Sequence, residues 1–548
     1  FSEASAGRLY NENWNTVSES YKGQQSWNGK SARDRYNSGY INERENYFHK
    51  PLANLNWYAQ WNEKVSQFTT LYYSGGTGGG TGTYGRVQYD RTGPSQIVDW
   101  DETIKENQVA EGDRGIIRNS VNNQWTLGGI SKVKVEWSEN FKMQVGVDWR
   151  TAKIDHFREV RDLMGLNSFD DSRTTNDFGS QEAVGLGDKI AYNNTNTVDW
   201  IGGFVQAEYK MEKFSIYATA GYSTIKYNYL NHFKAGDDGN ELQANTDWIG
   251  GYQIKGGANY NISETFSVFA NVGLISKVPI FDAVIDDYDG TVAENPENEE
   301  FTAIEGGAIF SSLDDKLTVK ANYYYTKWMN RTLTRGIQVT EELTGIAFIK
   351  GLDQLHQGFE LEANYRPIKL VGIGGIASFA NWNYLNDVSA QIKVWDGGEY
   401  VTDDINLYTK DLKVGDAPQT QFAAWVDVFP VTGLKLQFIM RHNSNHYADF
   451  NPADRGDETD RAQVWKTPSY TVFDAHANYQ LPLKGKLGVN IFAHVFNIGD
   501  TFYIQDALDN SRYNSYTGED GELSHTVNSA EVYLGLPFNF NLGVKVTL

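Results

Sequence analysis

Two histidines have a spacing that occurs in metal sites. His442 and His446 are four residues apart, and Asp449 and Asp454 follow closely. On a helix, this spacing could place two imidazoles on one zinc ion. Here the pair follows an alternating apolar segment typical of a strand, where a rise of about 3.3 Å per residue would hold the side chains too far apart to share an ion. The sequence therefore favours polar residues at the end of a strand, with a metal site as the alternative.

A glycine-rich segment, Gly80–Gly85, matches the G-x-G-x-x-G fingerprint of dinucleotide sites. That chemistry needs a helix that begins directly after the glycines, because its N-terminus holds the pyrophosphate. The residues that follow, Arg86–Asp90, have no helical period. We predict a flexible external loop here and no nucleotide cofactor.

Asp286, Asp287 and Asp289, with Gly290, form an acidic segment that hints at calcium. The EF-hand pattern needs ligands at alternate positions of a twelve-residue loop that closes on glutamate, and the register fails here. An acidic external loop is the simpler interpretation, and a calcium ion bound to the loop is the alternative. Acidic loops would also favour a cationic or metal-bearing ligand, although solvation explains them equally well.

Glu360 and Glu362 lie two residues apart, on one face of an expected strand that continues to Asn364. Paired carboxylates can do acid–base work. A continuous polar face instead favours the lining of a wet interior. Neither a Ser-His-Asp arrangement nor a nucleophile elbow is recognisable in the sequence, so we predict that the protein is not an enzyme and name no catalytic, cofactor or metal residue.

Aromatic side chains in the expected loops could contact a ligand. The alternatives are packing within the loops and anchoring at a membrane interface. We therefore name no substrate-binding residue. The aromatic residues considered are Trp14, Trp27, Tyr84, Trp100, Trp395 and Tyr400.

The elements that would position these residues are long segments in which apolar and polar residues alternate. Examples are Leu55–Trp61, Phe141–Trp149, Phe214–Tyr222, Leu317–Tyr325 and Leu487–Val495. Alternation with a period of two predicts β-strands. In a barrel within lipid, the apolar row faces outward and the polar row faces a wet lumen.

Eight tight turns join these segments into hairpins, and longer polar segments separate the hairpins. Outer-membrane barrels have short periplasmic turns and long extracellular loops. Eight hairpins and a final strand, Phe540–Leu548, make about seventeen strands, an odd number where single-chain bacterial barrels have an even one. The predicted turns lie near Asn62–Lys64, Ser138–Asn140, Lys210–Lys213, Asn261–Thr265, Ser312–Lys316, Tyr365–Lys369, Phe429–Gly433 and Leu481–Gly485.

Composition narrows the class further. The chain of 548 residues has a net charge of −22, which disfavours sequence-independent binding to nucleic acid. Mean hydropathy is −0.53, and the sequence contains no run of eighteen apolar residues that would form a transmembrane helix. Cysteine is absent, so disulfides and thiolate metal sites are excluded. The chain starts at Phe1 without a signal peptide, and we expect that its true beginning has been removed.

Several local motifs resemble TonB-dependent receptors, in particular those of Bacteroidota-type bacteria. Their order and spacing over nearly the whole chain carry the resemblance. The motifs are Ala32–Arg35, Tyr47–Pro51, His156–Leu163, Gly256–Gly273, Pro279–Asp282, Asn295–Glu297, Glu305–Gly307, Gly358–Glu362, Val495–Asn497 with Tyr503, and Phe540–Val544.

The resemblance implies an all-β fold, a transmembrane antiparallel β-barrel of 22 strands in the cell outer membrane, filled by an N-terminal plug. Residues 52–548 would supply the last seventeen strands, and residues 1–51 would be an extracellular loop region that precedes the first of them. The plug, its energy-coupling segment and the first five strands are not found in this sequence.

The function that the resemblance implies is active import of a scarce ligand such as a metal chelate, an oligosaccharide or a peptide. Partners would be outer-membrane lipid and lipopolysaccharide, the TonB-ExbB-ExbD complex acting through the plug, and a SusD-like surface lipoprotein or other outer-membrane subunits. The alternatives are a passive porin-like channel and a structural barrel subunit of a larger complex.

Overall fold

The computed structural model describes most of the chain. The described residues are 14–26, 32–35, 39–90, 92, 97–109, 114–286, 290–338, 344–396, 399–415, 417–483, 485, 487–509 and 525–547.

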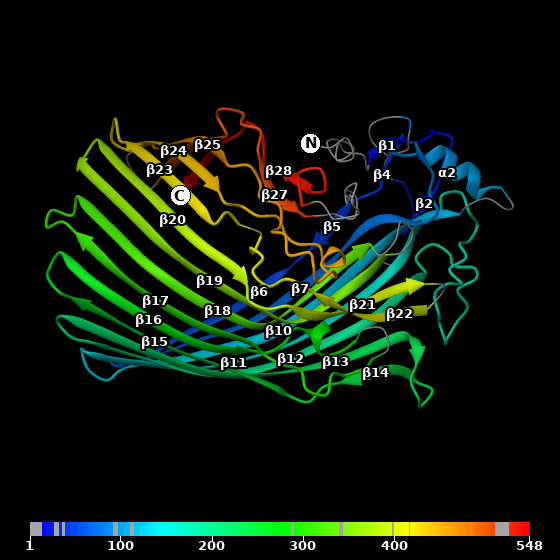
Figure 1. Ribbon diagram of the computed structural model, residues 1–548, viewed down its shortest axis with the longest axis horizontal. Coiled ribbons are helices and arrows are strands. Elements are labelled where there is room, and N and C mark those ends of the chain that lie inside the picture. The colour runs from blue at the N-terminus through cyan, green and yellow to red at the C-terminus, as the bar shows by residue number, and fades with distance from the viewer. Residues whose placement is uncertain are drawn as a thin grey trace.

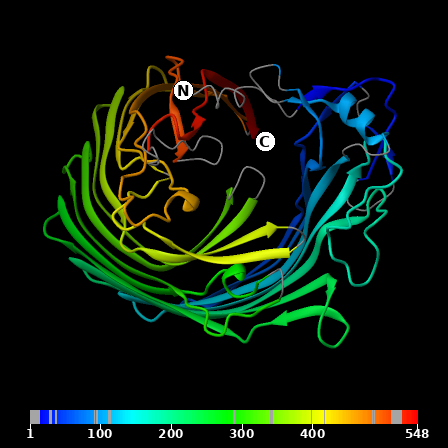
Figure 2. The ribbon, with the colours of Figure 1, turned by 45° about the vertical axis from the view of Figure 1, so that its right-hand side comes forward.

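One large antiparallel sheet dominates the fold and curves around an interior (Figures 1 and 2). Its strands are β5 (Asn46–His49), β6 (Leu52–Asn62), β7 (Val65–Gly85), β10 (Gly115–Glu136), β11 (Phe141–Asp162), β12 (Lys189–Lys210), β13 (Phe214–Ala235), β14 (Glu241–Asn245), β15 (Ile249–Asn261), β16 (Phe266–Lys277), β17 (Glu299–Ser311), β18 (Leu317–Gln338), β19 (Thr344–Ile368), β20 (Val371–Tyr384), β21 (Val388–Asp396), β22 (Glu399–Leu407), β23 (Thr420–Val428), β24 (Leu434–Ser444), β25 (Tyr470–Gln480), β26 (Gly488–Phe496) and β29 (Asn539–Thr547).

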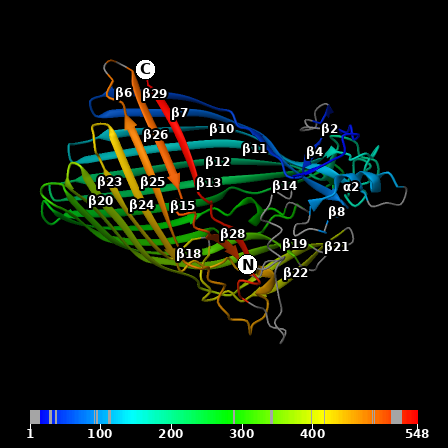
Figure 3. The same cartoon turned by 90° about the horizontal axis from the view of Figure 1, so that it is seen from above.

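Small elements gather at one end of this sheet, opposite the short turns (Figure 3). They are β1 (Trp14–Thr16), β2 (Gln24–Gln25), β3 (Arg33–Asp34), β4 (Tyr40–Asn42), β8 (Tyr89–Asp90), β9 (Ile97–Val98), helix α2 (Trp100–Asn107), the 3-10 turns η1 (Phe281–Ala283) and η2 (Pro452–Asp454), β27 (Ile504–Leu508) and β28 (Glu531–Leu534).

The two faces of the sheet separate apolar from polar residues. Tyr323, Phe359 and Phe379 are opposite one another on β18, β19 and β20, and all three are exposed. The neighbouring row on the other face holds Asn322 and Glu360. Apolar side chains exposed around the outside and polar ones inside are what a barrel in lipid requires, so the predicted alternation and fold class are confirmed.

The eight predicted tight turns each join two consecutive strands of the sheet. For example, β6 ends at Asn62 where β7 begins at Val65, and β19 ends at Ile368 where β20 begins at Val371. The last predicted strand is β29, and Leu548 lies outside the described residues. The count of 22 strands for the whole barrel stays a prediction.

Several strands continue well beyond the span of a bilayer. Strands β10 to β13 each have 22 residues, or roughly 70 Å at the usual rise, whereas a bilayer needs about 9 to 11 tilted residues. Gly80–Gly85 belongs to such an extension, because β7 pairs with β10 as far as Gly85↔Gly115. The predicted loop at these glycines is therefore wrong, since the backbone there is paired with β10 along the whole segment.

The seam between β29 and β6 differs from the rest of the sheet. The strand order is that of a closed barrel, with β29 next to β5 and β6. Register pairs join neighbours from β6 through β7 and β10 round to β29, but among the described residues none joins β29 to β5 or β6. Both edge strands are exposed on both faces.

Among the described residues, no helix has the length and apolar character needed to cross a membrane.

Candidate functional site at the outer end of the barrel

Two arginines meet on the inner face of the strand extensions. Arg118 on β10 and Arg158 on β11 lie on either side of Ser120, whose Oγ is 3.0 Å from Arg118 Nη1 and 3.4 Å from Arg158 Nε. Arg118 also donates to the Gly80 carbonyl, at 2.9 Å. Arg44 is close enough for its charge to act on Arg118. We call Arg44, Arg118 and Arg158 the arginine cluster.

Strand parity places the arginine cluster on the inner face. Arg118 and Ser120 are even-numbered residues of β10 and share one face. The odd-numbered residues lie on the other face, which faces outward because it includes the exposed Trp125 and Leu127. Register pairs Ser120 with Arg158, and paired residues share a face. The cluster therefore faces the space enclosed by the strands, at the end opposite the short turns.

The glycines of β7 make room for the cluster. A Cβ on Gly82 would lie 2.7 Å from Arg118 Nη2 and 2.8 Å from its Cζ. These distances are shorter than van der Waals contact, so side chains on β7 would displace those of β10. The glycine-rich segment thus positions arginines and holds no phosphate-binding helix start.

Aromatic rings complete the arginine cluster. The guanidinium carbon of Arg158 lies 5.5 Å from the centre of the Tyr84 ring and 5.2 Å from that of Tyr192, within cation–π range. The Tyr84 hydroxyl donates to Asp171 at 2.6 Å, which fixes the ring. Among the described residues, neither Arg118 nor Arg158 forms an ion pair with a carboxylate. Both guanidiniums are therefore available to bind an anion, although the whole chain has a net charge of −22.

The other aromatic candidates have different outcomes. Trp100 is fully buried in a cluster with Val98, Ile117 and Met164, so its side chain packs within the outer loops. Three candidates, Trp14, Trp395 and Tyr400, lie in strands β1, β21 and β22, and the side chains of these three residues are not described. Trp27 lies outside the described residues.

Glu360, one of the carboxylates predicted to line the interior, belongs to a hydrogen-bonded ladder across the four strands β16 to β19. Asn322 Nδ2 donates to Glu305 Oε1 at 3.4 Å and to Glu360 Oε2 at 3.1 Å, and Asn271 Nδ2 donates to Glu305 Oε2 at 3.1 Å. Glu362 pairs with Lys320 at 3.4 Å. In the described part of the chain, Glu305 and Glu360 have no cationic partner, so this wall can accept cations from a group inside the barrel.

The two histidines of the predicted metal alternative have separate surroundings. His442 Nδ1 lies 2.9 Å from Thr471 Oγ1 on β25, whereas His446 is buried beyond the end of β24 with Asp506 at 3.9 Å. No group of three or more metal-ligating side chains occurs among the described residues. Of the possible calcium ligands, Asp287 and Asp289 lie outside the described residues.

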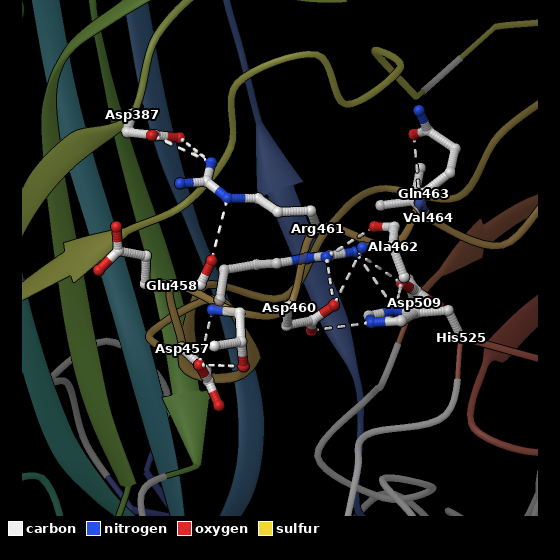
Figure 4. A network of polar contacts seen from close by, with 12 residues as sticks. Asp387, Asp457, Glu458, Asp460, Arg461, Ala462, Gln463, Val464, Asp509 and His525 are labelled. Atoms are coloured by element: carbon white, nitrogen blue, oxygen red, sulfur yellow. Dashed lines mark hydrogen bonds and ion pairs between the residues drawn. The ribbon is translucent and has the colours of Figure 1, made fainter.

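A buried ionic network joins two of the outer loops (Figure 4). Arg455, from the loop between β24 and β25, pairs with Asp460 at 3.5 Å and with Asp509 of the last loop at 3.4 Å. His525 bridges the same two carboxylates. The Arg455 and Asp509 side chains are each only 1% exposed. We call these four residues the loop clasp.

A comparison with protein families decides the class of this chain. The model described as "TonB dependent receptor-like, beta-barrel" matches residues 2–498. The chain belongs to the TonB-dependent receptor family. The family resides in the outer membrane, which agrees with the exposed apolar face, and the predicted recognition and location are confirmed at this level. The Bacteroidota type stays a prediction.

Individual TonB-dependent receptors are similar over part of their length. The ferrichrome outer membrane transporter/phage receptor of Escherichia coli K12 is 22% identical over 391 residues, which cover 68% of this chain and 44% of the transporter. The ferric-catecholate import receptor Fiu of E. coli K12 and the siderophore receptor PiuA of Acinetobacter baumannii each superpose with a TM-score of 0.56, at 11% and 12% identity. Each alignment covers 92% of this chain and 65% of the receptor, and identities this low show the fold alone.

The loop clasp contains a histidine, so we predict that the stability of the outer loops depends on pH. Burial lowers the pKa of His525, but its contacts with Asp509 and Asp460 more than offset this, so the pKa lies above its ordinary value. A raised pKa in the folded state means that the stabilisation is present at pH values below the unfolded pKa and is lost as the pH rises through the folded pKa. The loops should therefore be cleaved faster by added protease at about pH 8.5 than at about pH 6. Equal pH dependence in His525→Gln would contradict this role.

Proposed function

We propose that this chain forms the barrel wall of an active outer-membrane importer that takes up a negatively charged metal chelate. The arginine cluster is the observation that supports a negatively charged ligand. It presents two guanidiniums that form no ion pair with a carboxylate among the described residues, although Glu43 is near enough for its charge to act on Arg118. They lie beside tyrosine rings, on an inner face at the outer end. Guanidiniums bind carboxylates and related oxyanions with paired hydrogen bonds, and tyrosines offer flat rings to aromatic ligands.

The printed names of the similar proteins support a metal chelate as the ligand. They include a ferrichrome transporter, a ferric-catecholate import receptor and a siderophore receptor. A catecholate complex would supply both negative charge and aromatic rings, which matches the arginine cluster. We keep the predicted metal-bearing ligand as the proposal and propose a net negative charge on the whole chelate in place of the cationic alternative.

Transport would involve parts beyond this chain, which spans 44% of the ferrichrome transporter. We propose that residues 52–548, together with the short strand β5, belong to a 22-stranded barrel, that the rest of residues 1–51 lies outside it, and that further strands insert at the seam between β29 and β6. A plug inside the barrel would offer cations to Glu305 and Glu360 and would connect the receptor to TonB-ExbB-ExbD. Contacts with lipopolysaccharide and with a SusD-like lipoprotein stay predictions.

Ligand binding by the purified full receptor tests the proposed class. We expect a ferric catecholate to quench tryptophan fluorescence saturably and an uncharged ferric hydroxamate to bind at least tenfold more weakly, because it cannot pair with the guanidiniums. Equal binding of both probes, or no saturable binding of either, would contradict an anionic chelate as ligand.

A further inference from the structure

A pair of histidines on the inner wall of the barrel has the geometry of a metal site. His476 on β25 and His494 on β26 are opposite each other in the register. Their Nδ1 atoms are 2.9 Å apart and their ring centres 4.9 Å apart. In the sequence the two residues are eighteen positions apart, so no sequence motif joins them.

Both histidines face the lumen. The register continues from His476 to Gln437 on β24 and from His494 to Asn541 on β29, which places four polar residues in one row. The alternate residues on β25 and β26 include the exposed Phe473 and Ile491 on the outward face. The histidine pair lies near the short turn between β25 and β26, whereas the arginine cluster lies at the opposite end of the barrel. The two sites are therefore separate.

Aromatic neighbours hold the rings in place. Phe492 and Phe496 flank His494 on its own strand, with ring centres 5.5 Å and 6.2 Å away, and Phe496 also contacts His476 at 5.5 Å. The nearby cations are engaged by carboxylates: Arg441 pairs with Asp474 at 2.7 Å, and Lys435 with Asp427 at 3.0 Å. Their repulsion of an incoming cation is therefore partly compensated.

The two nitrogens are at hydrogen-bond distance, and that distance is also compatible with two adjacent positions on one metal ion. Metal–imidazole bonds of about 2.0 Å at a right angle separate two nitrogens by about 2.8 Å, whereas a tetrahedral angle separates them by about 3.3 Å. The observed 2.9 Å fits adjacent positions of a square-planar or tetragonal ion. Cu²⁺ prefers that geometry and binds nitrogen ligands most tightly among the divalent first-row metals.

We propose that His476 and His494 form a Cu²⁺ site on the lumen wall, with water in the remaining positions and the Gln437 and Asn541 side chains beside it. Without metal, one imidazole carries its proton on Nδ1 and donates it to the other. Binding needs both Nδ1 lone pairs, so the donating ring changes tautomer: its Nδ1 proton passes to the lumen water and a proton from that water is taken up on Nε2 of the same ring.

The test is a Cu²⁺ titration of the full receptor in detergent, followed by calorimetry and electron paramagnetic resonance. We expect His476→Ala and His494→Ala each to weaken the site at least tenfold, and the double variant to do no worse than either single one. His442→Ala, on the neighbouring strand β24, is the matched control and should bind as the wild type does. A heat-modifiable band on a denaturing gel shows that each variant is folded.

Wild-type spectra give a readout that does not depend on the variants. Labelling the histidines with ¹⁵N should change a superhyperfine pattern that arises from two equivalent nitrogens. Undiminished Cu²⁺ affinity in both single variants, or a wild-type spectrum with fewer than two nitrogen ligands, would overturn the site. Neither result bears on the anionic chelate proposed for the arginine cluster.

Discussion

Replacing Arg158 with alanine is expected to weaken the binding of a ferric catecholate by about ten- to a hundredfold. The change removes a guanidinium that has no carboxylate partner among the described residues and lies over two tyrosine rings. A hydrogen bond to a charged group contributes about 1.5 to 3 kcal/mol, and each 1.36 kcal/mol is a factor of ten. Titration of the purified full receptor measures the effect.

Two further variants sharpen that result. Arg158→Lys keeps the charge but loses the planar fork, so it should recover only part of the affinity. Arg366→Ala removes an exposed arginine at a short turn, where its guanidinium contacts the Lys369 carbonyl, and should leave affinity unchanged. An Arg158→Ala receptor that binds as tightly as the Arg366→Ala receptor would remove the arginine cluster from the ligand site.

Replacing Asp509 with asparagine is expected to release the outer loops. The substitution keeps the shape of the side chain but leaves buried Arg455 with Asp460 as its remaining carboxylate in the clasp. Breaking one side of a buried ion pair typically costs about 3 to 5 kcal/mol. We expect the loop between β24 and β25 and the loop after β26 to become sensitive to added protease while the barrel stays heat-modifiable.

A matched substitution lies beside the clasp. Asp387 pairs with Arg461 at 2.9 Å, but both side chains are substantially exposed (Figure 4). Exposed pairs contribute up to about 1 kcal/mol, so Asp387→Asn should change protease sensitivity little. Equal effects of Asp387→Asn and Asp509→Asn would show that burial of the clasp does not stabilise the loops.

The barrel could be predicted because its signals are local. Lipid forces outward residues such as Phe359 and Leu361 to be apolar, and the tight turns interrupt the alternation at recognisable places. The extensions beyond the bilayer could not be predicted in the same way. Both faces of Gly80–Gly85 and of its neighbours are away from lipid, so the apolar alternation that identifies a strand disappears there while the pairing continues.

The arginine cluster and the histidine pair could not be predicted from the sequence, because their residues become neighbours only through the register of the paired strands. Arg118 and Arg158 meet only when β10 and β11 pair, although the stretch that includes Arg158 was part of the family resemblance. His476 and His494 form a pair only once the turn near Leu481–Gly485 fixes which residues are opposite. His442 and His446 have a spacing in the sequence that is more typical of a metal site. They have different surroundings because β24 ends between them, at Ser444.

Uptake of a radiolabelled ferric catecholate by cells tests the central claim most directly. Cells that carry the full receptor should accumulate the label only when the TonB-ExbB-ExbD complex is present, and the Arg118→Ala/Arg158→Ala receptor should lose accumulation at limiting ligand. Binding at the cell surface should persist without the complex. Equal accumulation with and without the complex would contradict active import and favour a passive channel, and normal growth on the chelate after deletion of the receptor would favour a structural role.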